Sequence, residues 1–238
     1  MDAQQIRKLR PMLNKYLGEF DDCFSRSEPA ENLRVYVSGQ LSDLPRKSIE
    51  PMADRAGVPP RTLQQFLSLA SWDDPLMADR LAEIVARDHA HPMSIGVIAE
   101  TGDPKKGGKT PGVKRQWCGA LGKVDNCVVT VHLSYAAGDF HALLAGELFL
   151  PEAWSEDRER CRKAGIPDEV VHRPKWQIAL ELRDRAVANG VRFEWTTADE
   201  GYGEVPAFHF ALDDRGKRSS MAVISLRGDC AIGTGGRR

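Results

Sequence analysis

The sequence has few of the features that would assign a chain quickly to a class of protein. Its five cysteines are an odd number and form no C-x-x-C pair and no Cys/His cluster of zinc-finger spacing. Its 33 basic and 34 acidic residues leave a net charge of -1, too little to hold a polyanion by bulk charge. No run of eighteen apolar residues occurs, and the first ten residues do not read as a signal peptide. We therefore expect a reduced, cytoplasmic protein with no membrane span.

The remaining composition is that of an ordinary globular protein. Hydrophobic residues make up 42% and charged residues 28% of the 238 residues, enough for one large domain or two modest ones. The spacing of apolar residues changes near residue 92. Before it, apolar residues recur at intervals of three and four, which predicts a helical module over residues 1–91. After His91 and Pro92, short β-type runs alternate with helical stretches, which predicts an α/β domain.

The second half carries the signals of a sheet with a crossover helix. We expect strands over 94–100 and 127–135, a third strand closing at 149–150, a helix over 175–189 and a strand over 191–198. Gly190 stands where a helix is commonly ended by a residue of positive φ. Asp199 then follows the last predicted strand, at the strand end where open α/β sheets present their chemistry.

Residues 48–71 have the spacing of a helix-turn-helix. A short apolar face leads to Gly57, and Pro59-Pro60 opens a second helix. The exposed start of that helix would present Arg61, Gln64 and Gln65, whose side chains can hydrogen-bond phosphates or base edges. The alternative is a plain helical hairpin whose polar residues only face solvent.

Residues 104–123 contain six cations and no acidic residue, interleaved with glycines. Such a segment can approach a phosphate backbone closely, because glycines admit close contact and cations displace condensed counterions. The candidate DNA contacts in it are Lys105, Lys106, Lys109, Lys114 and Arg115. Trp117 would either stack on an unpaired base or hold the segment to the core. The alternative interpretation of the whole segment is a solvated hairpin.

Several ordered blocks resemble one family. They are residues 100–107 (ETGDPKKG), 112–119 (GVKRQWCG), 122–127 (GKVDNC), 147–154 (ELFLPEAW) and 199–203 (DEGYG). Together they resemble the DDE transposases of bacterial insertion sequences, in the branch numbered seven-hundred-one. The resemblance covers roughly residues 36–217. Residues 218–238 no longer resemble the family, and we expect an irregular tail there.

The resemblance implies an RNase H-like catalytic domain that cuts and rejoins the DNA ends of an element with two Mg²⁺ ions. The fold class expected is therefore α/β, an incomplete RNase H-like mixed sheet over residues 92–217, preceded by the all-helical DNA-binding module. The implied partners are DNA carrying the terminal repeats of the element and an intact transposase as a homologous subunit.

Three carboxylates are needed to hold two divalent ions about 3.5 to 4 Å apart. The resemblance assigns the first to the position of Ala99 and the second to Asp199, which alone is a candidate catalytic residue and metal ligand. Glu100 would replace the first only if a bulge re-aimed it, and Asp103 only by reaching from the loop. The third, a downstream glutamate, has no candidate after Glu204.

The sequence thus predicts a transposase by resemblance that lacks strand-transfer activity. The alternative, from a different class, is a non-catalytic DNA-binding protein or inhibitor that occupies element ends or pairs with an intact transposase. Salt-dependent binding to terminal repeats would favour the second interpretation.

Overall fold

Two units follow one another along the chain in a computed structural model. The structure describes residues 3–215, with the side chains of all but residues 3–8 and 200. The first unit ends at Arg80 and the second begins at Leu81, so the division falls within helix α5 (Asp74–Asp88). The change from helical to β structure comes a few residues later, between Asp88 and Ile95. The boundary expected after residue 91 coincides with this later change of secondary structure. That it separates two folding domains stays a prediction.

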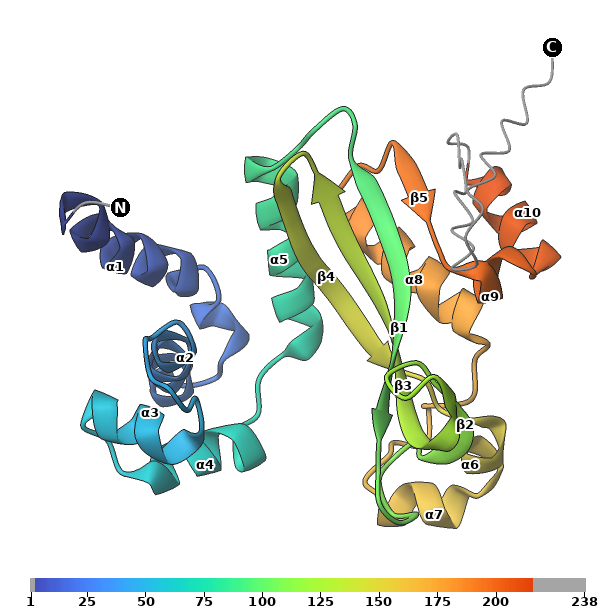
Figure 1. Cartoon of the computed structure of the whole chain (residues 1–238), viewed down its shortest axis with the longest axis horizontal. Coiled ribbons are helices and arrows are strands. Elements are labelled where there is room, and N and C mark those ends of the chain that lie inside the picture. Colours follow the sequence, from blue (N-terminus) through green and yellow to red (C-terminus); the bar gives the residue numbers. More distant parts are fainter. Residues whose placement is uncertain (1–2, 216–238) are drawn as a thin grey trace. The chain divides into compact units, whose positions relative to one another are not determined.

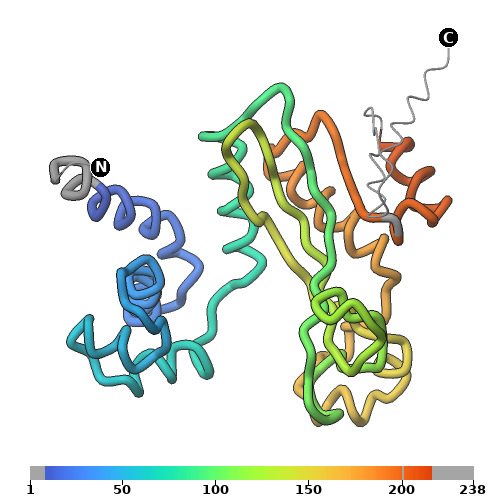
Figure 2. The backbone as a smooth tube through the Cα atoms, viewed as in Figure 1, coloured from blue at the N-terminus to red at the C-terminus, as the bar shows by residue number. Residues whose placement is uncertain are grey.

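The described part of the first unit is helical. It contains α1 (Ala3–Gly18), the short 3-10 helix η1 (Asp21–Cys23), α2 (Ser27–Gln40), α3 (Ile49–Ala56) and α4 (Pro60–Leu69). Figure 2 shows the turn between α3 and α4 as a tight reversal of the backbone. Met52, Ala53 and Leu63 form the buried contact between these helices. A Cβ on Gly39 would lie 2.8 Å from Met52, so the close approach of α2 to α3 requires a glycine there.

The second unit is built on a mixed sheet of five strands, labelled in Figure 1. They are β1 (Ile95–Pro104), β2 (Lys114–Cys118), β3 (Lys123–Ala137), β4 (Phe140–Leu148) and β5 (Trp195–Thr197). β1 is antiparallel to β3 and parallel to β5. The long β3 pairs with β2 along its first residues and with β4 along its last. The mixed α/β fold expected from the sequence is confirmed.

Helices of the second unit follow β4 and β5. They are α6 (Glu152–Glu156), α7 (Arg158–Lys163), α8 (Lys175–Ala188), α9 (Glu200–Gly203) and α10 (Pro206–Asp214). Ile98 and Leu133, on one face of the sheet, are buried in one cluster with Ile178 of α8. Phe208 of α10 is buried in the same cluster. This face holds the main core, because side chains alternate between the two faces of a strand.

Three expectations about strand limits need correction. The strand expected over 191–198 extends only over Trp195–Thr197, because the amides of Glu194 and Trp195 both donate to the carbonyl of Ser94 at its start. The strand expected to close at 149–150 ends at Leu148. The strand expected over 94–100 runs four residues further, to Pro104, since it keeps pairing with β3. Gly190 has a φ of 90°, as expected for a residue that ends a helix.

Candidate catalytic corner and nucleic-acid interface

The middle of β1 and the end of β5 adjoin at the corner where the family resemblance places the first two ligand positions. β1 and β5 pair in register from Ile95 opposite Trp195 to Val97 opposite Thr197. Extending that register by two residues brings Ala99 level with Asp199. Both residues are exposed. Ala99, with its methyl group, lies within β1, which continues to Pro104, and only Asp199 follows the end of its strand as expected. That either position belongs to a metal site stays a prediction.

Asp199 begins the short helix α9. Its carbonyl accepts hydrogen bonds from the amides of Tyr202 and Gly203, each at 3.2 Å. Its carboxylate lies close to Gly201, where an added Cβ would be 3.3 Å from one carboxylate oxygen. The residues after Asp199 thus turn tightly around it. Asp199 is exposed at the corner, and its role as a metal ligand stays a prediction.

Glu100 occupies the opposite face of β1 from Ala99. The pairing of β1 with β3 is continuous from Ile95 to Pro104, so no bulge re-aims the Glu100 side chain toward Asp199. Instead, its carboxylate accepts a hydrogen bond from the Lys175 ammonium at 2.5 Å. That ammonium lies 5.4 Å from the centre of the Phe149 ring. Glu100 is therefore neutralised within the protein.

The Tyr202 hydroxyl is buried beside this ion pair. Burial raises the pKa of Tyr202 well above its usual range, and the negative charges of Glu100 and Asp199 add to the effect. Among the described residues the hydroxyl forms no hydrogen bond of ordinary geometry. The Glu100 carboxylate is therefore a charged neighbour of Tyr202 rather than an acceptor with good geometry.

Asp103 lies four residues beyond Ala99 on β1, a separation of about 13 Å along an extended strand. Its carboxylate pairs with Lys105 instead. Among the side chains that the structure describes, which leave out Glu200, no three His, Cys, Asp or Glu groups gather closely enough to hold a metal ion. With a methyl group at Ala99 and the Glu100 carboxylate held by Lys175, the corner in this part of the chain does not fit a pair of divalent ions.

The candidate DNA contacts of the second unit lie together, on the loop after β1 and the start of β2. We call residues 104–115 the basic loop. The side chains of Lys106, Lys109, Lys114 and Arg115 are exposed, and Lys105 is half-buried. The side-chain amide of Asn126 donates to the carbonyls of Lys105 and Gly107, both at 2.8 Å. These neutral contacts fix the backbone without using the cations, of which all but Lys105, paired with Asp103, are exposed.

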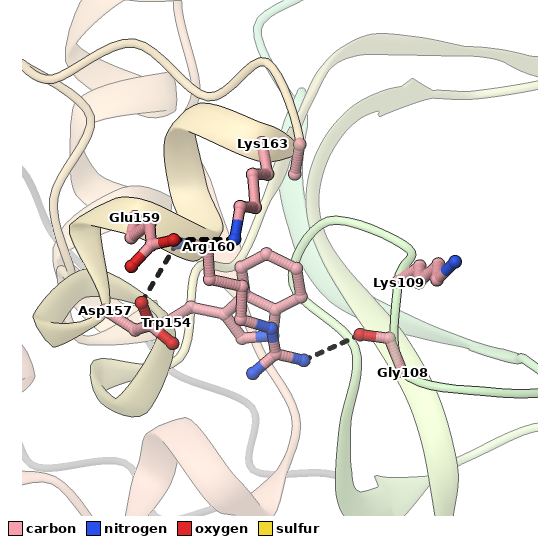
Figure 3. Close-up of a pocket in the computed structure, with 8 residues that line it drawn as sticks. Gly108, Lys109, Trp154, Asp157, Glu159, Arg160 and Lys163 are labelled. Atoms are coloured by element: carbon pink, nitrogen blue, oxygen red, sulfur yellow. Dashed lines mark hydrogen bonds and ion pairs between the residues drawn. The ribbon is translucent and has the colours of Figure 1, made fainter.

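A second anchor of the basic loop comes from α6 and α7, drawn in Figure 3. The Arg160 guanidinium lies 3.6 Å from the centre of the Trp154 ring and donates to the carbonyl of Gly108 at 2.8 Å. The Trp154 indole donates to the carbonyl of Val113 at 2.8 Å. We call this arrangement the Trp154 clamp. It borders an open cavity of about 510 Å³ that Lys109 and Lys163 also line.

Sequence reasoning missed the Trp154 clamp. Trp154 entered the sequence comparison only as part of the block over residues 147–154; it is 1% exposed, and its indole also fixes the basic loop. Arg160 was not singled out at all. The available signal was the basic run at 158–163, with four cations in six residues and a tryptophan nearby.

The helix-turn-helix residues lie in the first unit. α3 ends at Gly57, which has a φ of 69°, and Pro60 is the first residue of α4. Arg61, Gln64 and Gln65 are exposed on α4, while Leu63 and Phe66 are buried. The two helices and their turn agree with the spacing seen in the sequence. DNA contact by these three polar side chains stays a prediction.

The mixed sheet, in which Ala99 of β1 is level with Asp199 after β5, is consistent with an RNase H-like nuclease fold. The chain matches the model of the DDE superfamily endonucleases over residues 19–227, and it belongs to that family. It is 33% identical over 196 residues to a probable transposase for the insertion sequence element IS701 from Microchaete diplosiphon. The match covers 81% of this chain and 48% of that relative, so the chain spans about half the length of the relative.

None of the helices described between residues 3 and 215 is long and apolar enough to cross a bilayer. DDE superfamily nucleases generally use a divalent metal and act on DNA. The ion that this chain would bind and the DNA sequence that it would recognise remain proposals.

Proposed function

We propose that this chain is an insertion-sequence transposase by descent that binds the DNA ends of an element but does not itself transfer strands. The observation that carries the proposal is the register of β1 and β5, which brings Ala99 level with Asp199. The fold builds the corner, yet the side chain at the first ligand position has no oxygen. A two-metal in-line step needs that oxygen to hold the ions on both sides of the reacting phosphate.

DNA binding rests on two separate sets of side chains. Arg61, Gln64 and Gln65 are exposed at the start of α4, the place from which a recognition helix reads base edges. Four cations of the basic loop, Lys106, Lys109, Lys114 and Arg115, are exposed on a backbone that Asn126 holds in place. Phosphate contacts of this kind supply affinity, and base contacts from α4 would supply sequence preference.

The terminal repeats of the element are the proposed DNA partner, and Mg²⁺ the ion that an intact relative would use. As a binder without the full ligand set, the chain would occupy element ends or join an intact transposase as an inactive subunit. The buried cluster that joins α8 and α10 to the sheet supports this role, because it shows a core built without the missing carboxylate.

Binding is tested by fluorescence anisotropy with a labelled duplex that carries the element end, against a scrambled duplex, at low and moderate salt. The variant Arg61→Ala/Gln64→Ala should lose the preference for the end sequence. The matched control is Asn14→Ala/Lys15→Ala, which also removes one amide and one cation from an exposed helix surface, on α1. Equal binding to both duplexes by a folded protein would overturn end recognition.

Catalysis is tested by incubating the same labelled duplex with the protein in Mg²⁺ and in Mn²⁺. We expect no cleavage and no joined product. Cleavage that disappears in an Asp199→Ala variant would show that the corner is active and that the proposal is wrong. Cleavage that persists in that variant would come from a contaminating nuclease and would leave the expected result standing.

A further inference from the structure

The outer face of the hairpin formed by β2 and β3 carries an exposed aromatic side chain. Trp117 is 61% exposed and lies directly opposite Val124, which is 53% exposed. Leu121, in the turn between the strands, is 45% exposed. We call these three residues the hairpin patch. A large indole left in water is costly unless it has a ligand, so the patch is a candidate interaction surface.

The inner face of the same hairpin shows that Trp117 does not hold it to the protein. Cys118 and Cys127 are fully buried there, and the Cys118 thiol donates to the carbonyl of Gly102 on β1 at 3.4 Å. The Gln116 side chain donates to the carbonyl of Cys127 at 3.1 Å. Of the two roles that the sequence left open for Trp117, anchoring to the core is therefore taken by its neighbours.

The charges around the patch point to the chemistry of its ligand. Arg115 lies two residues before Trp117, so both side chains leave the same face of β2, and Arg115 is exposed. Lys114 and Lys123 belong to the opposite face, because they pair with the buried Cys127 and Cys118. An arginine beside an exposed aromatic ring suits a phosphate next to a free base.

A protein partner fits these features less well. Protein interfaces are enriched in tryptophan and arginine but depleted in lysine, whereas the strand that carries Trp117 follows the basic loop with its exposed Lys106 and Lys109. Intact duplex DNA also fits less well, because its bases are stacked and present no free face to an indole. A base without a pairing partner has two free faces.

We infer that the hairpin patch is a stacking platform for an unpaired base of a DNA strand. The indole of Trp117 takes the face of the base beside Val124, and Arg115, on the same face of β2, contacts a flanking phosphate. The inference rests on the proposed DNA binding and adds to it the state of the DNA, a strand with at least one unpaired nucleotide. It requires no base sequence, since every base has a face to stack.

The test compares two labelled DNAs of one sequence, a blunt duplex and the same duplex with a three-nucleotide single-stranded overhang, using the whole protein. Trp117→Ala should weaken binding of the overhang DNA by about 5- to 150-fold, which corresponds to roughly 1–3 kcal/mol per stacked base. Trp117→Phe, which keeps a ring, should lose less. Phe210→Ala is the matched control, because Phe210 is a 70% exposed aromatic residue on α10. An overhang of abasic nucleotides should remove the difference between Trp117→Ala and the parent.

The outcomes separate this inference from the proposed function. A protein that ignores the blunt duplex but binds the overhang through Trp117 keeps the platform and loses duplex-end recognition. A Trp117→Ala variant that binds the overhang as tightly as the parent overturns the platform, whatever happens with the duplex. Equal losses on both DNAs and on the abasic overhang also overturn it. So does a concentration-dependent dimer, seen by sedimentation, that Trp117→Ala abolishes with no change in DNA binding.

Discussion

Two regions that both depend on β1 differ in what they have kept of the family pattern. At the catalytic corner, the pairing of β1 with β5 brings two positions level, but the first is Ala99. At the basic loop, which follows β1, the cations are present and the backbone is held by Asn126 and Arg160. In both regions backbone contacts set the geometry, and only the second has the side chains that its proposed chemistry requires. Under the proposed function, the fold persists where one of its functions does not.

The largest effect of a single substitution is expected at the Trp154 clamp, which holds the basic loop. Trp154→Ala removes a side chain that is 1% exposed, its hydrogen bond to Val113 and the surface on which Arg160 stacks. We expect a loss of about 3–5 kcal/mol in the free energy of unfolding, measured by urea denaturation. DNA binding through the basic loop should weaken as well, under conditions where the variant is still folded.

Two further variants make that measurement specific. Trp154→Phe keeps most of the ring volume and loses the indole N–H, so it should cost about 1–3 kcal/mol. Trp117→Ala removes an indole that is 61% exposed and should change stability by less than about 0.5 kcal/mol. Similar losses for the two alanine variants would show that the clamp does not stabilise the loop.

A smaller effect is expected at the catalytic corner, where Lys175 holds Glu100. Lys175→Met leaves the Glu100 carboxylate, 24% exposed, without its cation and should cost about 1–3 kcal/mol in the free energy of unfolding. Adding Glu100→Gln should recover part of the loss, because the uncompensated charge is then gone. Thermal or urea unfolding of the two single variants and the double variant measures the coupling. Strictly additive losses would contradict the pairing.

The corner should also give stability a pH dependence through Tyr202. Because the pKa of Tyr202 is raised in the folded protein, its contribution is fully present below the ordinary tyrosine pKa of about 10. Above that pH the unfolded chain loses the proton that the folded protein keeps, and stability falls by about 1.4 kcal/mol per pH unit. Unfolding of the parent and of Tyr202→Phe between pH 8 and 11 checks this. The free energy of unfolding of the parent relative to that of Tyr202→Phe should fall above about pH 10. A relative stability that does not change with pH would contradict the assignment of the raised pKa to Tyr202.

Local signals in the sequence were sufficient for much of this structure. The helix over 175–189, the turn at Gly57 and the position of Asp199 after the last strand follow from periodicity and from the backbone preferences of glycine. The Trp154 clamp could not be found in that way. It joins Trp154 to Val113 across 41 residues and Arg160 to Gly108 across 52, and such pairings leave no periodic pattern.

The candidate site shows the same difference between what sequence patterns indicate and what long-range contacts determine. Resemblance located Ala99 and Asp199, and the sheet register then put them level. The pairing of Glu100 with Lys175 spans 75 residues and connects a strand to a helix, so spacing alone did not indicate it. The sequence also did not determine whether Trp117 is exposed, because the same residues suit an indole that anchors the hairpin and one that projects from it.

The smallest effect is expected for a single cation of the basic loop, Lys109. Lys109 is exposed and, among the residues described, forms no ion pair. If it contacts a phosphate, Lys109→Ala should lower the slope of log affinity against log salt by about 0.9 and weaken binding equally for end and scrambled duplexes. Arg87→Ala on α5 is the control, since Arg87 already pairs with Asp88 at 2.7 Å. A lower slope for both variants would indicate diffuse attraction, and a lower slope for Lys109→Ala alone would identify the basic loop as the part of the second unit that contacts the DNA backbone.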